Sequence, residues 1–260
     1  MEDVYNNTDL FYGILPVFLG TQALYWVTYL VCPYLFSSFW NKLDVGKQSY
    51  WAASFVSCTL STIIAVKTMQ IGFPRGMYMY FSYDHYWADE RARDLCYMIC
   101  GYFFSDLAIG VYYHDKWPGH IANYIHHTAG IFAFAHLAKW NMGHGIALST
   151  FMLESTNVFN NLRWFLDTAG MKESHSTLYL GNGIVFTVSF FVIRVVAFTM
   201  AGYHYMIVKG DQFWGQHWHY KALFLTTYFT CFSLQYFWFS KLAQGLYKIL
   251  TKPKKVKKVE

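Results

Sequence analysis

Seven long apolar stretches recur along the chain, and they restrict its fold more than any other feature. The hydrocarbon core of a bilayer is about 30 Å thick, and a helix needs about 20 mostly apolar residues to cross it. Only 13% of the residues are charged and 55% are hydrophobic, which excludes soluble, disordered, collagenous and small disulfide-rich chains. We therefore predict an all-α polytopic membrane protein with seven transmembrane helices, near residues 10–32, 50–70, 95–114, 118–138, 143–166, 179–208 and 220–249.

The placement of lysine and arginine predicts the orientation of these spans. None precedes the first span, whereas Lys42 and Lys47 follow it and five lysines lie between Lys252 and Lys258. Since cytosolic segments carry the excess of positive charge, we expect a lumenal N-terminus and a cytosolic C-terminus. The net charge of +5 comes from this tail, and no other basic stripe could follow a phosphate backbone, so we expect no nucleic-acid partner.

The chain ends in Lys257-Lys258-Val259-Glu260, which resembles the dilysine signal for retrieval to the endoplasmic reticulum. In that case the COPI coat reads the tail and the protein resides in the endoplasmic reticulum membrane. The alternative is a merely basic tail that holds anionic lipid. At the other end, Asn6 begins a glycosylation sequon, although it lies close to the bilayer.

Ionisable side chains inside the predicted spans are the first candidates for function. Each costs about 2.5–3.5 kcal/mol at membrane depth, so those present usually face a cavity or a partner. At 100° per residue, Glu154, Asn157, Asn161 and Trp164 share one face of a helix. We expect a single bundle interior to gather the polar residues of five spans: Asp106, Asn123, His126, His127, Glu154, Asn157, Asn161, Arg194 and Gln235.

The consecutive histidines point about 100° apart, so the sequence leaves open whether His126 or His127 faces the cavity. Gly130, one turn after His126, favours that residue. The histidine spacings match no metal-binding box, so we expect no metal. Phe237 stands where an archaeal-type retinal pump has aspartate one turn before its lysine, which argues against a retinal protein with Lys241. The five cysteines are interpreted as small apolar packing groups.

The chemistry of the cluster has two interpretations. A neutral imidazole can take a proton from a hydroxyl or an amine, or attack a thioester, and a carboxylate such as Asp106 or Glu154 can orient it. Alternatively, the polar groups satisfy one another between helices, with Arg194 pairing with Glu154 or Asp106.

Three segments on successive spans carry a resemblance to a known family. They are Gly101-Tyr102-Phe103-Phe104-Ser105-Asp106-Leu107, Asn123-Tyr124-Ile125-His126-His127, and Leu153-Glu154-Ser155-Thr156 running into Asn160-Asn161-Leu162-Arg163-Trp164. In this order they resemble the TLC domain, shared by the translocating-chain-associating membrane protein, the ceramide synthases and a neuronal ceroid lipofuscinosis protein. The resemblance covers about residues 45–250. It implies six helices around a lipid-accepting cavity, preceded here by one extra span, and residence in the endoplasmic reticulum.

The resemblance implies acyl transfer only in part. In ceramide synthases the paired histidine carries acyl transfer from a thioester, and this pair matches His126 and His127. The next motif of those enzymes, histidine-aspartate-x-serine-aspartate, reads Leu153-Glu154-Ser155-Thr156-Asn157 here. One carboxylate remains and the histidine is missing, which argues against ceramide synthesis but not against another acyl transfer.

Two hypotheses follow for a chain divided into a lumenal N-terminus with the first span (1–44), a TLC domain (45–250) and a basic cytosolic tail (251–260). The first is a protein that binds or handles an acyl lipid and contributes to membrane lipid homeostasis. The second is an acyltransferase that uses acyl coenzyme A as substrate and needs no cofactor, with His126, His127, Asp106 and Glu154 as catalytic residues. In either case we expect the lipid to contact Tyr102, Asn123, Asn157, Asn161, Trp164, Arg194 and Gln235.

Overall fold

The computed structural model describes residues 7–75, 84–117 and 120–251, and these residues form helices joined by short connections. The sequon residue Asn6 and the dilysine tail lie outside the described residues. The elements are α1 (Asn7–Leu35), α2 (Ser37–Trp40), α3 (Val45–Gly72), η1 (Phe73–Arg75), α5 (Glu90–Tyr112), η2 (His114–Lys116), α6 (His120–Trp140), α7 (His144–Phe151), η3 (Met152–Thr156), α8 (Asn157–Thr168), α9 (Ser176–Ser189), η4 (Phe190–Ala197), α10 (Phe198–Tyr203), η5 (His204–Val208), α11 (Gly210–Trp214) and α12 (Trp218–Thr251).

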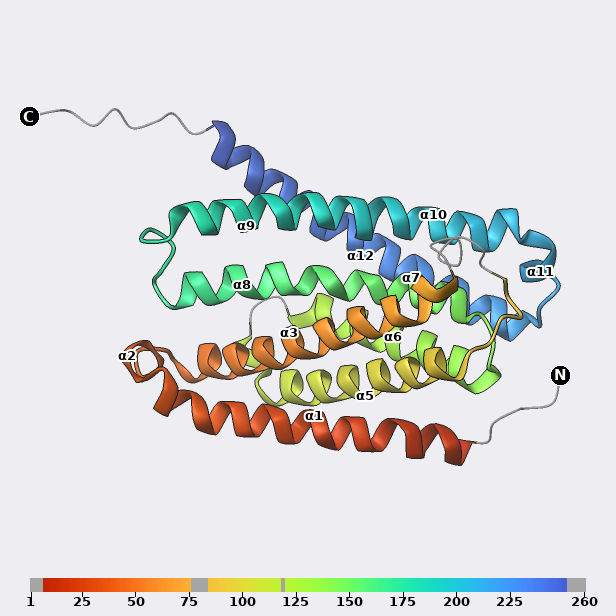
Figure 1. Ribbon diagram of the computed structural model, residues 1–260, viewed down its shortest axis with the longest axis horizontal. Helices are drawn as coiled ribbons and strands as arrows, with labels where there is room; N and C mark the ends of the chain where they lie inside the picture. Colours follow the sequence, from red (N-terminus) through yellow and green to blue (C-terminus); the bar gives the residue numbers. More distant parts are fainter. Residues whose placement is uncertain (1–6, 76–83, 118–119, 252–260) are drawn as a thin grey trace, which may run out of the picture.

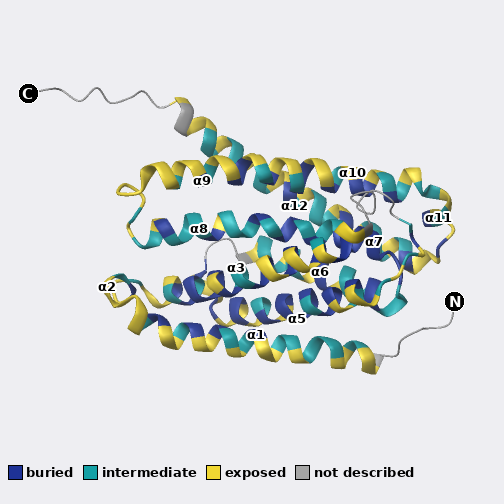
Figure 2. Cartoon of the chain, in the orientation of Figure 1, coloured by how far each residue is buried: buried dark blue, intermediate teal, exposed yellow. Residues whose placement is uncertain are grey.

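The long helices run back and forth along one direction and form a single bundle (Figure 1). The burial pattern places α3 and α5 at the centre of the bundle, whereas α1 and α9 expose much of their surface (Figure 2). Many of the exposed side chains on α1 are large and apolar, among them Leu30 and Leu35. An apolar outer surface of this kind is what a bilayer requires.

Each predicted span coincides with a helical segment of the described chain. By length and composition, four of these segments can cross a membrane: Thr8–Leu35, Val45–Gly72, Glu90–Tyr112 and Ser176–Val208. The prediction of an all-α chain with several spans is therefore confirmed. It stays a prediction that α6, the helical segment from α7 to α8, and α12 also cross the membrane.

Aspartate side chains begin two of these helices. The carboxylate of Asp44 accepts a hydrogen bond from the backbone N–H of Lys47, and the carboxylate of Asp89 accepts from those of Arg91 and Ala92. These bonds satisfy backbone donors that have no partner inside the helix. The bond from the backbone N–H of Lys47 also lowers the pKa of the Asp44 carboxyl, because the charged form of the carboxyl is the better acceptor.

Residues 84–89 tie the ends of several helices together. The buried His85 ring stacks on Tyr205, and its Nε2 lies 2.9 Å from the carbonyl oxygen of the same residue. The backbone N–H of Gly143 donates to the carbonyl of His85, and that of Asp89 donates to Nδ1 of His144. Burial lowers the pKa of His85 to about 4, so the ring is neutral at physiological pH.

Two of the long helical segments, each made of several consecutive elements, depart from α-helical geometry at mid-length. The helical segment from α7 to α8 tightens into a 3₁₀-helix at η3. The helical segment from α9 to η5 widens into a π-helix at η4 and again at η5. Such segments often mark functional positions, because they redirect side chains that a regular helix would place elsewhere. Here η3 carries Glu154 and η4 carries Arg194.

Gly202 tests the packing between α10 and α12. A Cβ built at this position would overlap the phenol of Tyr228, whose hydroxyl donates to the carbonyl of Phe198. We expect Gly202→Ala to displace that ring and to destabilise the protein by about 1–3 kcal/mol. Thermal unfolding in detergent micelles measures the effect. Gly181→Ala on α9 is the control, since a Cβ there meets nothing, and an equal loss in both variants would contradict the expectation.

Candidate functional site

The bundle encloses a polar cavity of about 360 Å³. Its walls come from α3, α5, α6, η3, α8, α9, η4 and α12, in the half of the bundle where α12 ends. Of the predicted site residues, nine line this cavity: Tyr102, Asp106, Asn123, His126, His127, Glu154, Asn157, Asn161 and Arg194.

The other two predicted residues lie behind this wall. Gln235 lines a neighbouring cavity, and its Oε1 accepts a hydrogen bond from Arg194. Trp164 lines neither cavity and packs edge-to-face on Tyr50, with ring centroids 4.9 Å apart. Trp164 therefore supports a wall residue, because Tyr50 itself faces the polar cavity.

One imidazole pairs with a carboxylate at the cavity wall. Nδ1 of His127 lies 3.1 Å from Oδ2 of Asp106, and the His127 ring stacks on Phe103 with centroids 4.4 Å apart. Next to this pair, the Tyr102 hydroxyl donates to Oγ of Ser57. A carboxylate at Nδ1 fixes the orientation of the ring and favours a tautomer whose Nε2 is free to accept a proton.

The guanidinium of Arg194 donates hydrogen bonds to three side chains. Its Nε donates to the Thr156 hydroxyl at 2.6 Å, its Nη2 to Oδ1 of Asn157 at 2.8 Å and its Nη1 to Oε1 of Gln235 at 3.4 Å. Nη2 also lies 3.9 Å from Oε1 of Glu154. The side chain is only 4% exposed, so its donors serve the bundle interior.

The carboxylate of Glu154 belongs to the same network. Its Oε2 accepts from the side-chain amide of Asn157 at 2.8 Å, and Asn157 also donates to Ser61 on α3. Asp106 is thus the carboxylate that orients an imidazole, whereas Glu154 serves as the counter-ion of Arg194. Sequence reasoning left that pairing open between the two carboxylates.

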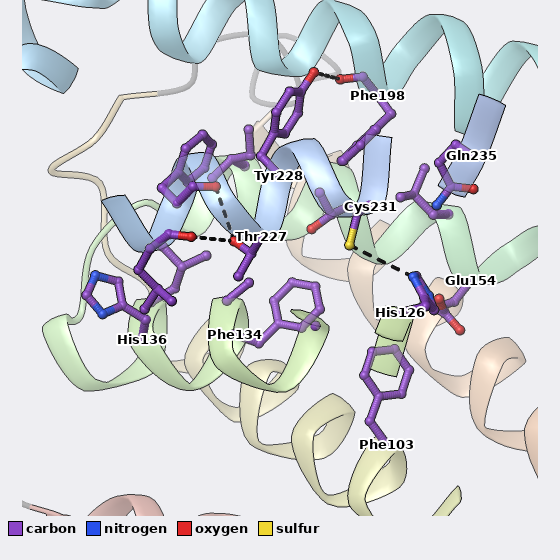
Figure 3. A pocket seen from close by; sticks show the side chains of 18 residues that line it. Phe103, His126, Phe134, His136, Glu154, Phe198, Thr227, Tyr228, Cys231 and Gln235 are labelled. Atoms are coloured by element: carbon purple, nitrogen blue, oxygen red, sulfur yellow. Dashed lines mark hydrogen bonds between the residues drawn. The ribbon is translucent and has the colours of Figure 1, made fainter. Parts of the chain in front are cut away.

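A second, apolar cavity of about 70 Å³ adjoins the polar one (Figure 3). Both cavities are lined by His126 and Glu154. Of the two consecutive histidines, both line the polar cavity, and His126 also lines the apolar one. Gly130 lines the apolar cavity as well, but the ring of Phe103 lies against its Cα.

Sequence reasoning considered Lys241 only as a retinal-binding lysine and did not place it in the site, but it lines the polar cavity from α12. Its side chain is exposed and lies over the ring of Phe237, and within the described residues no carboxylate oxygen comes within 4.0 Å of its Nζ. The insertion cost of a lysine inside an apolar span was the signal that could have found it. Among the described residues, no group of three His, Cys, Asp or Glu side chains could hold a metal ion.

The Arg194 network should dominate the stability of the bundle. Arg194→Met leaves the buried carboxylate of Glu154 without its counter-ion, and breaking a buried pair in this way costs about 3–5 kcal/mol. Adding Glu154→Gln should restore much of the loss. Unfolding of the purified protein in mixed micelles measures both changes. Arg163→Met, at a partly exposed site that contacts Tyr179, is the control, and an equal loss there would contradict the expectation.

Comparison with known proteins gives the same assignment along nearly the whole chain. The family model of the TLC domain matches residues 10–244. TLC domain-containing protein 4-B of Danio rerio is 25% identical over 258 residues, which cover 96% of this chain and 93% of that protein. TLC domain-containing protein 4 of Homo sapiens is 25% identical over 199 residues, covering 74% and 72% respectively. No solved structure matches the chain significantly. The chain belongs to the TLC domain family of membrane proteins.

Proposed function

We propose that this protein binds an acyl lipid, with the headgroup in the polar cavity and the start of the acyl chain in the apolar one, and so contributes to membrane lipid homeostasis. The observation that supports this most is the junction of two cavities of opposite character at His126 and Glu154. An amphiphile is the ligand class that matches such a pair. A long chain requires the side chains around the small apolar cavity to move apart, because 70 Å³ holds only a short segment.

One cation at the polar cavity favours an anionic headgroup. Two of its charged groups, Arg194 and Glu154, form one pair, and Asp106 is engaged with His127. Lys241 adds a cation without a carboxylate partner in the described part of the chain. In addition, Nδ2 of the buried Asn161 has no hydrogen-bond partner in the part of the chain that the structure describes, and it can donate to a headgroup oxygen. A carboxylate or phosphate would complement both.

The proposed setting is the endoplasmic reticulum membrane, with seven spans and a cytosolic tail that the COPI coat reads. The polar cavity lies in the half of the bundle where α12 ends. With a cytosolic C-terminus, the headgroup therefore enters from the cytosolic leaflet, where anionic lipids are enriched.

Photo-crosslinking tests the binding. Purified protein is incubated with a photoactivatable fatty acid or phosphatidic acid, and the crosslinked peptides are identified by mass spectrometry. We expect crosslinks at the walls of the apolar cavity, and Ala133→Phe, which fills that cavity, should abolish them. Val188→Phe is the control, because Val188 is 55% exposed on α9. Crosslinks that stay unchanged in Ala133→Phe would refute the proposal.

Headgroup recognition is tested in the same assay. Lys241→Ala should weaken crosslinking of the anionic probes about fivefold to tenfold, corresponding to about 1 kcal/mol for one exposed charge, and should leave a neutral diacylglycerol probe unaffected. Lys248→Ala on the exposed end of the same helix is the matched control.

The pairing of His127 with Asp106 favours a second candidate, an acyl-coenzyme-A-dependent acyltransferase. In that reaction His127 takes the proton of the acceptor, and Asp106 stabilises the charged imidazole. Asp106→Asn should lower transfer of a labelled acyl group to membrane lipids about 10²- to 10⁴-fold while acyl-lipid crosslinking persists. Bound lipid with no transfer in the parent protein would leave lipid binding as the function.

A further inference from the structure

Cys231 meets His126 at the junction of the two cavities. Sγ of Cys231 on α12 lies 3.9 Å from Nδ1 of His126 on α6, which is within range of a sulfur hydrogen bond. Figure 3 shows the two side chains pointing toward each other across the apolar cavity. In this arrangement the ring can take the thiol proton at the moment when the sulfur attacks a carbonyl carbon.

Gln235 adds an independent observation at the same place. It follows Cys231 by one turn of α12, so the two side chains share a helix face, and both line the apolar cavity. Its side chain is fully buried, and among the described residues Nε2 has no hydrogen-bond partner. Because Oε1 already accepts from Arg194, the amide is held with its donor end available. A buried donor without a partner beside a nucleophile is suited to a carbonyl oxygen.

The other cysteines lack these features. Cys32 and Cys96 are buried among apolar side chains, and the thiol of Cys100 donates to the carbonyl of Ile131. Cys58 is only partly buried, but it lines neither cavity. Cys231 also packs against the apolar cluster of Leu153, Phe198 and Tyr228, as the sequence suggested, but unlike these four cysteines it contacts an imidazole.

From this geometry we infer that Cys231 accepts an acyl group from a fatty acyl thioester held in the cavities, and so becomes S-acylated. The inference rests on the proposed function, because it needs the acyl chain to lie in the apolar cavity. It differs from the acyltransferase candidate in its nucleophile, its base and the atom that carries the acyl group.

The reaction is a thioester exchange without any change in oxidation state. The thiol proton of Cys231 passes to Nδ1 of His126, and Sγ attacks the carbonyl carbon of the thioester. Nε2 of Gln235 donates to the oxygen on which negative charge develops. The bond from the carbonyl carbon to the leaving sulfur then breaks, and the leaving thiolate takes the proton from His126. The products are S-acyl Cys231 and a free thiol.

The experiment follows the acyl group on the purified full-length protein. The protein is incubated in micelles with an alkynyl palmitoyl coenzyme A, and adducts are located by peptide mass spectrometry with and without neutral hydroxylamine, which cleaves thioesters. We expect one hydroxylamine-sensitive adduct, at Cys231, that Cys231→Ala abolishes. Cys58→Ala is the matched control and should leave it unchanged. An adduct at Cys58 and none at Cys231 would overturn the inference.

Two further variants test the roles of the neighbouring side chains. His126→Ala should slow acylation about 10²-fold at pH 7, and the deficit should shrink as pH rises, because hydroxide then forms the thiolate without the imidazole. Gln235→Leu should slow it about 10²-fold at every pH. Equal rates in the parent and in His126→Ala at pH 7 would overturn the assignment of the base.

Photo-crosslinking on the same samples separates this inference from the proposed function. Crosslinks at the apolar cavity without a Cys231 adduct overturn the inference and leave lipid binding intact. If neither crosslinks at the apolar cavity nor a Cys231 adduct form, the inference and the proposed lipid binding are both overturned. Transfer of the labelled acyl group to membrane lipids that Asp106→Asn abolishes, with no adduct at Cys231, overturns the inference in favour of the acyltransferase candidate.

Discussion

The buried guanidinium of Arg194 is the constraint on which the rest of the structure depends. A charge at this depth is expensive to desolvate, and it is tolerated only because hydroxyl, amide and carboxylate groups surround it. Those partners come from η3, α8 and α12, so one side chain holds three parts of the bundle in register. The network also consumes Glu154, which leaves Asp106 as the carboxylate that serves an imidazole.

The network also separates the two cavities by chemistry. On one side, amides, hydroxyls and charged groups line a space large enough for a headgroup. On the other side, side chains such as Phe134, Leu153 and Phe198 line a narrow apolar space. His126 and Glu154 stand at the border. Any amphiphile that enters both spaces must therefore pass its first carbons, or its carbonyl, beside His126 and Cys231.

Sequence reasoning recovered the helical segments and the gathering of polar residues because both follow from the cost of polar groups in lipid. It missed how far the cavity extends along each helix. Trp164 shares a face of the regular helix α8 with Asn157 and Asn161, but it follows Asn161 by nearly one turn and packs on Tyr50 outside the cavity wall. The contact of His126 with Cys231 joins residues 105 positions apart, and no local sequence pattern predicts such a contact.

The π-helix η4 has a consequence for how related chains can differ in length. Its wider turns change the angular phase between α9 and α10, so residues before Phe190 and after Ala197 do not follow one helical wheel. A chain that lacked a single residue in this segment could run as a continuous α-helix and keep the later side chains in nearly the same direction, because a π segment holds one residue more than the α-helix it replaces. Phe198 and Gly202 would then still face α12. A deletion of one residue is therefore easier to accommodate here than in the regular α-helical segments.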